Sequence, residues 1–434
     1  MTARYTEIEA CRICGNRQLD PVFHLGTQYL TGVFPRTTEA QSALTRGPLE
    51  LVKCRSGAAQ NTCGLLQLRH SYSPSEMYGA NYGYRSSLNR SMIEHLHAKV
   101  RRILQRVPLA DGDCVLDIGC NDGTLLMAYP ESGILVVGMD PTAAKFRQHY
   151  PAHVRLVTDY FSAAEFGKAS GGRKAKIVTS IAMFYDLEDP LEFVRQVRDV
   201  LADDGVWVFE QSYMPEMLET GSYDTICHEH IEYYALSQIR WMMAHAGLKI
   251  LDVELNAVNG GSFSVMVAKL PAPYQANEQA IGRVAEAERA AGLDAMDPYL
   301  RFSERAARHR EELTGLLRAI NGRGQKILGY GASTKGNVIL QYCGLTRREL
   351  PCIAEVNEDK FGAQTPGTGI PIVSEREARA LKPDYFLVLP WHFRDNIVQR
   401  EESYLNSGGK LLFPLPRIEI VSAGGRTAGF PDRP

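Results

Sequence analysis

Short apolar runs alternate with helical segments through the middle of the chain, from about residue 110 to residue 270. Buried strands are predicted for the runs CVLDIG, ILVVGMD, VRLVTD, KIVTSIAMF and GVWVFEQ, and a helix is predicted for PLEFVRQVRDVLADD. Strands that alternate with helices in this way are typical of a parallel α/β sheet. Two further runs, LKILDVEL and SFSVMVAKL, are expected to extend this sheet to about Leu270.

An amphipathic helix is predicted immediately before the sheet. Its apolar positions are spaced by three and four residues, which places them on one face: Met92, Leu96, Val100, Ile103, Leu104 and Val107. Pro108 is expected to follow the end of this helix. We therefore assign residues 76–270 to one central α/β domain.

The segments on either side have different patterns. Residues 1–75 are rich in turn signals and short β-like runs, and the segment PAPYQ after Leu270 indicates a domain boundary. Residues 271–320 are predicted to form a charged helical connection. A second α/β alternation is predicted for residues 321–420, with the strands KILGYGA, CIAEVNE, DYFLVLPW and KLLFPL, and residues 421–434 are expected to be a loose tail.

The composition excludes several classes of protein. A chain of 434 residues is long enough for about three compact domains. Hydrophobic residues make up 44% and charged residues 23%, which excludes wholesale disorder. The 48 Lys and Arg against 50 Asp and Glu give a net charge of -2, so neither nucleic acid nor a membrane is expected as a partner. Without a long apolar run or a signal sequence, a cytoplasmic location is expected, and the choice between monomer and homodimer stays open.

Four of the nine cysteines have the spacing of a zinc site. Cys11 and Cys14 form a CxxC pair, and Cys54 and Cys63 follow about forty residues later, with eight residues between them rather than the usual two. Four thiolates close a tetrahedral Zn²⁺ site and leave no open position, so the metal is expected to be structural. The alternative is a set of reduced cysteines without a metal.

A turn that contains two glycines follows the first predicted strand of the central domain. It lacks the third glycine of the dinucleotide pattern GxGxxG, which disfavours NAD. Asp140 ends the second strand, where an acid can hold both hydroxyls of a ribose, and Asp159 follows the third strand. The alternative is that these acids are ordinary polar loop residues.

The motif DIGCNDG followed by VGMDP resembles the S-adenosylmethionine (SAM) site of class I methyltransferases. This resemblance implies that Asp140 binds the ribose and that Asp159, with Tyr160 or Phe161, lies at the adenine. It assigns the methionine end of SAM to the turn, with Asp117, Gly119, Asn121 and Gly123.

The densest polar stretch of the chain is YDTICHEHIEYY, which contains His228, Glu229 and His230 in a row. A zinc-protease motif is excluded because its two helical histidines need three intervening residues to share a face. One histidine is a candidate general base, with Glu229 to fix its tautomer or stabilise its cation. The alternatives are a buried structural histidine pair and a nucleophilic role for Cys227.

A second glycine-rich turn, GYGASTKGN, lies between a predicted strand and a predicted helix. It is not a Walker A loop. In that loop a glycine precedes the lysine and Ser or Thr follows it, whereas here Gly336 follows Lys335. The backbone amides of such a turn favour an anion, so Gly331, Lys335 and Asn337 are candidates to contact a diphosphate. Trp391 and His392 are candidates to stack on or bond to a base. The alternatives are a structural turn and an aromatic residue at an interface.

Together, these motifs resemble those of the sugar-nucleotide C-methyltransferases. The resemblance extends from about Cys11 to Val421 and rests on CRICG with Cys54 and CGLLQL, EMYGANYGYRSS, DIGCNDG, MFYDLEDP, EQSYMP, YDTICHEHIEYY, NGGSF, GYGASTKGN and LPWHF. It implies an α/β fold with a small zinc-binding N-terminal domain, a class I SAM methyltransferase (Rossmann-like) core and a second Rossmann-like C-terminal domain. SAM and Zn²⁺ are the implied cofactors.

The resemblance also implies a reaction and roles for residues. The substrate is a 4-keto-6-deoxy sugar carried on a nucleoside diphosphate, and a carbon next to the ketone is deprotonated and then methylated. His230 is implied as the base, with His228 and Glu229 ordering it. Tyr82 or Tyr84 is implied to reach the sugar.

The chain departs from the better-known members of this family at two positions. Cys227 replaces a tyrosine, and Asp186 replaces a histidine. Three roles stay open for Asp186: it orients the base, assists proton transfer or contacts a hydroxyl. These changes keep open a SAM-dependent enzyme that methylates oxygen or a non-sugar keto substrate. A non-enzymatic zinc-containing binding module is disfavoured by the intact Asp117, Gly119 and Asp140 and by the histidine triplet.

Overall fold

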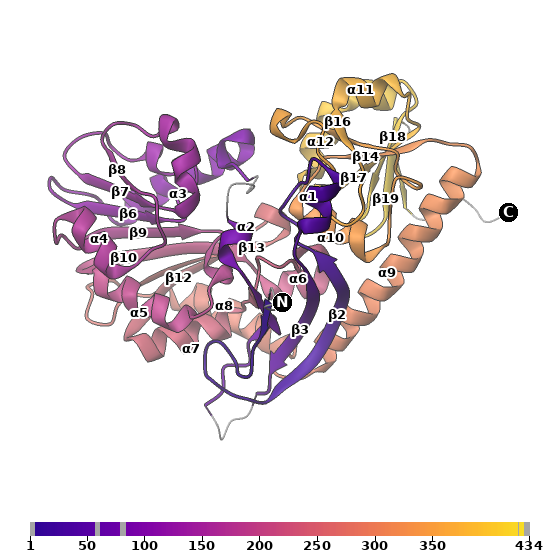
Figure 1. Ribbon diagram of the computed structural model, residues 1–434. Coiled ribbons are helices and arrows are strands. Elements are labelled where there is room, and N and C mark those ends of the chain that lie inside the picture. Colours follow the sequence, from indigo (N-terminus) through magenta and orange to yellow (C-terminus); the bar gives the residue numbers. More distant parts are fainter. Residues whose placement is uncertain (1–4, 57–60, 79–83, 424, 429–434) are drawn as a thin grey trace.

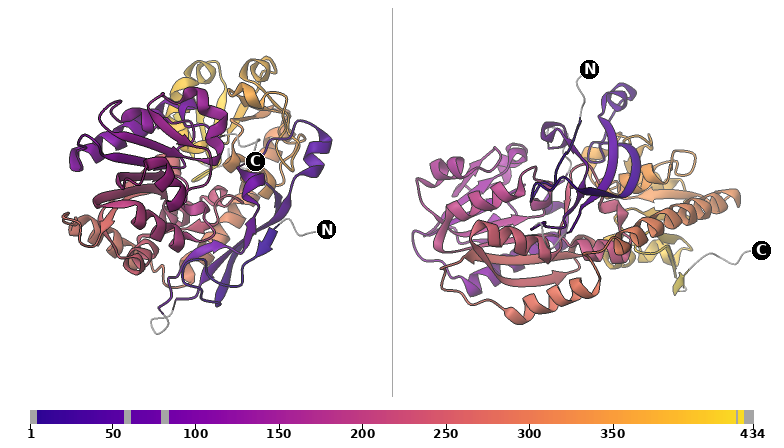
Figure 2. Two further views of the ribbon diagram at one scale, coloured as in Figure 1. Left: turned by 60° about the vertical axis from the view of Figure 1, so that its left-hand side comes forward. Right: turned by 90° about the horizontal axis from the view of Figure 1, so that it is seen from below.

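The computed structural model describes residues 5–56, 61–78, 84–423 and 425–428, and these form three modules built on β-sheets (Figure 1). The strands of the N-terminal module lie along one side of the junction between the central and C-terminal modules (Figures 1 and 2). No helix in this part of the chain combines the length and the apolar character that crossing a membrane requires.

The N-terminal module contains a small antiparallel sheet. Its strand β3 (Arg46–Cys54) pairs with β2 (Leu19–Tyr29) on one side and with β4 (Leu66–Leu68) on the other. The fourth strand, β11 (Glu232–Tyr233), comes from the histidine-rich stretch of the central module and pairs with β4. The other elements are β1 (Tyr5–Glu7), β5 (His70–Tyr72), α1 (Thr38–Ala43) and α2 (Pro74–Met77). The N-terminal sheet is therefore completed by a distant part of the sequence.

The central module is a seven-stranded sheet with the order β12-β13-β10-β9-β6-β7-β8. The five strands predicted to be parallel are confirmed, and they are β6 (Cys114–Ile118), β7 (Leu135–Met139), β8 (Val154–Val157), β9 (Ala175–Ile181) and β10 (Leu201–Ser212). The predicted extension is an antiparallel edge, in which β13 (Ser262–Lys269) pairs with β10 and with β12 (Leu248–Asn256).

Helices cover both faces of the central sheet. The predicted amphipathic helix is α3 (Arg90–Arg106), which begins at Asn89, whose Oδ1 accepts the amide N–H of Ser91 at 3.0 Å. Its apolar stripe packs against one face of the sheet, with Val115 at the contact, whereas the neighbouring Leu116 faces the opposite core. That core is covered by α4 (Ala163–Ser170), α5 (Pro190–Val200) and α7 (Leu236–Ala246), and α6 (Met214–Thr220) follows β10. Burial on both faces explains why the strands are nearly all apolar.

The predicted helical connection consists of two helices, α8 (Glu278–Ala290) and α9 (Asp297–Gly322). Glu288 of α8 accepts the amide N–H of Leu236 at 2.6 Å and so caps α7. The long helix α9 lies along β2, where the rings of Phe302 and Phe23 are 5.6 Å apart (Figure 1). This helix joins the N-terminal and C-terminal modules through one apolar core.

The C-terminal module is a second seven-stranded sheet, with the order β16-β15-β14-β17-β18-β19-β20. Five strands are parallel: β14 (Ile327–Tyr330), β15 (Ile353–Glu355), β16 (Ile372–Ser374), β17 (Tyr385–Val388) and β18 (Lys410–Phe413). Its helices are α10 (Thr334–Tyr342), α11 (Glu375–Ala380), α12 (Arg394–Arg400) and α13 (Glu402–Asn406).

The prediction that the C-terminal sheet ends at residue 420 is wrong. β19 (Glu419–Ser422) and β20 (Gly425–Ala428) form an antiparallel edge, so the sheet extends into the segment expected to be a loose tail. The last strand has the sequence GRTA, which lacks the apolar residues that reveal a buried strand.

Candidate active site

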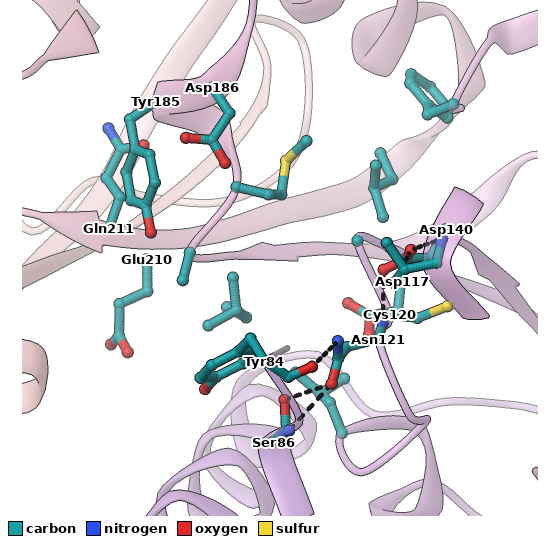
Figure 3. A pocket seen from close by; sticks show the side chains of 18 of the residues that line it. Tyr84, Ser86, Asp117, Cys120, Asn121, Asp140, Tyr185, Asp186, Glu210 and Gln211 are labelled. Atoms are coloured by element: carbon teal, nitrogen blue, oxygen red, sulfur yellow. Dashed lines mark hydrogen bonds between the residues drawn. The ribbon is translucent and has the colours of Figure 1, made fainter. Parts of the chain in front are cut away.

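A cleft lies at the carboxyl ends of β6, β7, β9 and β10, the edge where open α/β sheets bind ligands (Figure 3). Its polar residues form two groups. The first end of the cleft, called here the turn end, contains Asp117, Asn121 and Asp140. The opposite end, called here the β10 end, contains Tyr185, Asp186, Glu210 and Gln211.

Asp140 directly follows β7 and holds the turn that follows β6. Its Oδ2 accepts the amide N–H of Asn121 at 2.8 Å, and its Oδ1 accepts the amide and the hydroxyl of Thr142, both at 2.6 Å. Asn121 has a φ of 48°, a left-handed conformation that asparagine tolerates. Because a carboxylate oxygen has two lone pairs, Oδ2 of Asp140 can accept one more hydrogen bond from a ligand.

The glycines predicted in this turn allow a close approach of neighbouring side chains. Gly119 and Gly123 have φ values of 76° and 82°, and a Cβ on Gly119 would lie 2.9 Å from Cγ of Met183. Asp117 is buried and accepts the hydroxyl of Thr179 at 2.6 Å. Burial raises the pKa of Asp117 to about 7. The turn therefore brings a buried carboxyl group and closely packed backbone to this end of the cleft.

Two of the three residues predicted at the adenine line the cleft. Tyr160 and Phe161 are lining residues, and the ring of Phe161 packs edge-on against Phe193, with 5.3 Å between centroids. Asp159 is exposed and is absent from the cleft lining, and its Oδ1 accepts the amide N–H of Tyr160 at 2.7 Å.

The predicted tyrosines of the YGANYGY segment have different outcomes. Tyr82 lies outside the described residues. Tyr84 lines the cleft, and its carbonyl oxygen accepts Nδ2 of Asn121 at 3.3 Å. Ser86 is bonded to the same asparagine through its amide and hydroxyl, so this segment borders the turn end of the cleft (Figure 3).

Asp186 lies in the short 3₁₀ turn η4 (Phe184–Asp186) that follows β9. Its Oδ1 is buried and has no hydrogen-bond partner in the described part of the chain. Burial raises the pKa of Asp186 well above its ordinary value, and the negative charges of Glu229 and Glu232 raise it further. The carboxyl group of Asp186 therefore holds its proton more tightly than an ordinary aspartic acid, and it lines the cleft.

His230 lies behind Tyr185 rather than in the cleft wall. The two rings are 4.4 Å apart between centroids, and Tyr185 lines the cleft. Nδ1 of His230 is 2.9 Å from the carbonyl oxygen of Thr225, and because a carbonyl only accepts, Nδ1 carries the hydrogen. Nε2 is thus the proton-accepting nitrogen. Burial lowers the pKa of His230 to about 4, and the positive charge of Lys335 also lowers it, so the ring is neutral at pH 7.

The other two members of the triplet face the N-terminal module. His228 is fully buried, and its ring lies edge-on to Tyr72 at 4.6 Å. The carboxylate of Glu229 lies so close to Gly32 that a Cβ there would be 2.0 Å from Oε1. Burial raises the pKa of Glu229 to about 7. In the part of the chain that the structure describes, His230 is the member of the triplet whose ring contacts a residue of the cleft wall.

Sequence reasoning missed two polar residues at the end of β10. Glu210 is held by a set of charged and polar partners, namely His95, Lys99 and Asn256, at 2.5 to 2.8 Å. Burial opposes its ionisation, but the bond to His95 and the charge of Lys99 prevail and lower the pKa of Glu210 to about 2. Gln211 is next in the strand and is 1% exposed. The signal that identified Asp140, a polar residue at the carboxyl end of a buried strand, applies equally to both.

The four predicted metal ligands come together at the base of the N-terminal sheet. The Sγ atoms of Cys11, Cys14, Cys54 and Cys63 all lie within 4.8 Å of one another, with Cys11 and Cys63 at 3.4 Å and Cys14 and Cys54 at 3.6 Å. A tetrahedral ZnS₄ site with Zn–S bonds near 2.3 Å places its sulfurs about 3.8 Å apart. The cluster therefore fits a closed structural zinc site.

Three of the residues predicted to bind substrate in the C-terminal module contact other modules. Nζ of Lys335 donates to the carbonyl of Asn259 at 2.7 Å, and Nδ2 of Asn337 donates to the carbonyl of Thr31 at 2.7 Å. Nε1 of Trp391 donates to Asp224 at 2.7 Å.

The two further members of this predicted set are Gly331 and His392. Gly331 packs against Pro390, where a Cβ would be 2.7 Å from the proline ring. Burial lowers the pKa of His392 to about 3, and the charge of Lys335 lowers it further, so this ring is neutral. Asn259 lines the cleft, so the second glycine-rich turn adjoins the cleft through a junction between modules.

Three family models match consecutive parts of the chain. A methyltransferase domain matches residues 92–253, a C-methyltransferase C-terminal domain matches residues 257–416, and a model described as a zinc binding domain matches residues 11–78. The central module accordingly has the class I SAM methyltransferase fold.

Among proteins of known function, the chain is 32% identical over 418 residues to the C-methyltransferase NovU of Streptomyces niveus, covering 96% of this chain and 97% of the relative. It is 31% identical to a ubiquinone biosynthesis O-methyltransferase of Histophilus somni over 102 residues, 22% of this chain and 43% of that protein.

Two solved methyltransferase structures each match less than half of the chain. Magnesium protoporphyrin IX methyltransferase of Synechocystis with bound SAM covers 41% of this chain and 79% of its own, at 16% identity and a TM-score of 0.31. A SAM-dependent methyltransferase of Clostridium acetobutylicum covers 41% of this chain and 92% of its own, at 14% identity and a TM-score of 0.31.

Proposed function

The chain belongs to the family of SAM-dependent C-methyltransferases that join a zinc-binding domain, a methyltransferase domain and a C-terminal domain, and we propose that its acceptor is a 4-keto-6-deoxy sugar on a nucleoside diphosphate. The methylated atom is then the carbon next to the ketone. The observation that carries this proposal is the fixed tautomer of His230, whose ring leaves Nε2 as the proton acceptor and packs against Tyr185 at the β10 end of the cleft.

His230 acts as the general base in this proposal. Its Nε2 takes the proton from the carbon next to the ketone, and the electron pair of the broken C–H bond moves to the carbonyl oxygen. That pair returns to form the bond between carbon and the methyl group, while the pair of the methyl–sulfur bond leaves with the sulfur. A neutral imidazole is the form that such a step requires, and the low pKa of His230 keeps it neutral.

The turn end of the cleft aligns the methyl donor. Bound SAM supplies a methyl group on a positively charged sulfur, which is already a good electrophile. Oδ2 of Asp140 has the spare acceptor capacity to bind a ribose hydroxyl, and Tyr160 and Phe161 supply apolar surface for the adenine. The turn with Gly119, which lines the same end of the cleft, is proposed to face the methionine end. Alignment of donor and acceptor supplies much of the rate enhancement in such a site.

The four-cysteine cluster is proposed to hold a structural Zn²⁺. Four thiolates fill the tetrahedral coordination of zinc, so the site has no position for substrate. Cys11, Cys14, Cys54 and Cys63 then fix the N-terminal sheet, and through β11 this sheet reaches the segment that carries His230.

The decisive experiment is product analysis by NMR after incubation with SAM and a panel of nucleoside-diphosphate 4-keto sugars. A new methyl group on the carbon next to the ketone is the expected result. Methylation on oxygen, or turnover of non-sugar ketones alone, would replace the proposed function with one of the alternatives that Cys227 and Asp186 leave open.

A further inference from the structure

Gln211 lies near the carboxyl end of β10, in the wall of the cleft (Figure 3). Gln211 is 1% exposed, and neither Nε2 nor Oε1 of its side chain has a hydrogen-bond partner in the described part of the chain. An unpaired buried amide costs folding free energy on the order of 1–3 kcal/mol. Such a group in a native protein calls for an explanation, and a ligand that supplies the missing partner is one.

The backbone around Gln211 is rigidly held. On one side the strand pairs with β13, where Gln211 is opposite Phe263, and on the other side the amide of Ala182 donates to the carbonyl of Glu210 at 2.7 Å. Because the main chain is held on both sides, the side-chain amide projects from a fixed position, and a positioned donor favours stabilisation of a transition state.

Gln211 and its neighbour Glu210 differ in charge and in their hydrogen-bond partners. The carboxylate of Glu210 is negatively charged and already paired with His95 and Lys99, so it repels a developing oxyanion. The amide of Gln211 is neutral and carries two N–H donors without a partner. Of these two consecutive residues, only Gln211 suits an oxygen atom that becomes negative during the reaction.

We propose that the side-chain amide of Gln211 donates a hydrogen bond to the carbonyl oxygen of the acceptor and holds this oxygen as it becomes an enolate. The inference rests on the proposed function, because only a keto acceptor develops charge on that oxygen. The electron pair released by proton transfer to His230 then resides on an oxygen bonded to Nε2 of Gln211, and it returns to carbon during methyl transfer. Gln211 is thereby a catalytic residue, because its amide contacts the reacting oxygen.

The test compares Gln211→Met with wild type, using whichever keto acceptor from a panel of 4-keto nucleotide sugars and simple ketones the wild type methylates. Loss of one oxyanion donor lowers kcat by on the order of 10²- to 10³-fold. The same variant should exchange the acceptor's C–H proton for solvent deuterium more slowly by a similar factor when S-adenosylhomocysteine is bound. Its affinity for S-adenosylhomocysteine should stay within about threefold of wild type.

The melting temperature of Gln211→Met separates the proposed catalytic role from a purely structural one. Methionine has nearly the same length but no unpaired polar atoms, so the variant should unfold at the same or a higher temperature than wild type. Gln279→Met at an exposed position of α8 is the matched control and should retain wild-type turnover. A kcat or an exchange rate near wild type, or a loss of activity that merely follows a lower melting temperature, would overturn the role of Gln211.

The proposed function fails in a different way from this inference. If wild type methylates no keto acceptor, the proposed function is rejected and the role of Gln211 with it. If wild type methylates a keto acceptor and Gln211→Met does so equally well, only the role of Gln211 is rejected.

Discussion

The backbone amide of Leu68 donates a hydrogen bond to the carbonyl oxygen of Ile231, with 2.8 Å between the two atoms. Leu68 belongs to β4 of the N-terminal sheet, whereas Ile231 follows His230. The amide of Ile231 in turn donates to the carbonyl of Tyr185 at 3.0 Å, and Tyr185 lines the cleft. The segment that carries the proposed base is therefore fixed between the N-terminal sheet and the cleft wall.

A first prediction concerns the metal. Purified protein should contain about one zinc per chain, because the four thiols fit one closed tetrahedral site. Cys11→Ser should lower the soluble yield more than it changes the kcat of the surviving active fraction. Elemental analysis and yield measurements check both points. Cys352→Ser is the matched control, since Cys352 is a buried cysteine outside the cluster and its loss should leave the zinc content unchanged. Active, folded protein without zinc would contradict the prediction.

A second prediction separates two acids of the cofactor site. Asp140→Ala should weaken the binding of SAM by on the order of 10- to 100-fold, because it removes a charged acceptor that also holds the turn. Asp159→Asn should change the affinity by less than about threefold, since this side chain is exposed and lies outside the cleft lining. Isothermal titration calorimetry measures both, and NAD should not bind. Equal losses in the two variants would contradict the assignment of Asp140.

A third prediction concerns the base. His230→Ala should lower kcat by on the order of 10²- to 10⁴-fold, the usual contribution of a positioned general base. Binding of S-adenosylhomocysteine should be nearly normal, because His230 lies outside the turn end of the cleft. His245→Ala on α7 is the control for loss of a surface histidine. If His230→Ala still exchanged the acceptor proton for deuterium at the wild-type rate, the role of base would pass to Asp186 or His228.

A fourth prediction follows from the buried carboxyl group of Glu229. Burial raises its pKa from 4.5 to about 7, so between these values the folded protein keeps a proton that the unfolded chain releases. The stabilisation is complete below about pH 4.5 and is lost as the pH rises through about 7. Glu229→Gln cannot release this proton. Its free energy of unfolding, relative to wild type, should therefore increase by up to about 3 kcal/mol between pH 4.5 and pH 8.

Urea unfolding of both proteins at several pH values in this range measures the effect. Glu286→Gln on the exposed face of α8 is the control and should show no such trend relative to wild type. A difference between Glu229→Gln and wild type that is constant with pH would show that Glu229 ionises normally in the folded protein.

Much of the fold follows from local sequence patterns. The parallel strands of the central sheet, α3 with its end before Pro108, and the four-cysteine cluster are all visible as periodicity, turn signals or spacing. The pairing of β11 with β4 is not visible in the sequence, because it joins residues more than 160 positions apart and β11 has only two residues. The polar strand β20 likewise has no apolar pattern.

In the candidate site, too, the residues with a local sequence signal could be predicted and those placed by tertiary packing could not. The turn after β6 and Asp140 were predictable because a glycine-containing turn and an acid at a strand end are local signals. The contacts of Lys335 with Asn259 and of Asn337 with Thr31 depend on how modules pack, and the sequence carries no local sign of that packing. The position of His230 behind Tyr185 depends on tertiary structure in the same way.

The contribution of β11 to the N-terminal sheet has a consequence for synthesis on the ribosome. Residues up to β5 emerge first, yet the edge of β4 stays unpaired until Glu232 and Tyr233 have left the exit tunnel. An unpaired strand edge is a site for association with other chains. During translation of the intervening 160 or so residues, at roughly 5–20 residues per second, the nascent N-terminal module exposes this edge for about 8 to 32 seconds. The first module to be made is thus the one whose sheet is completed late.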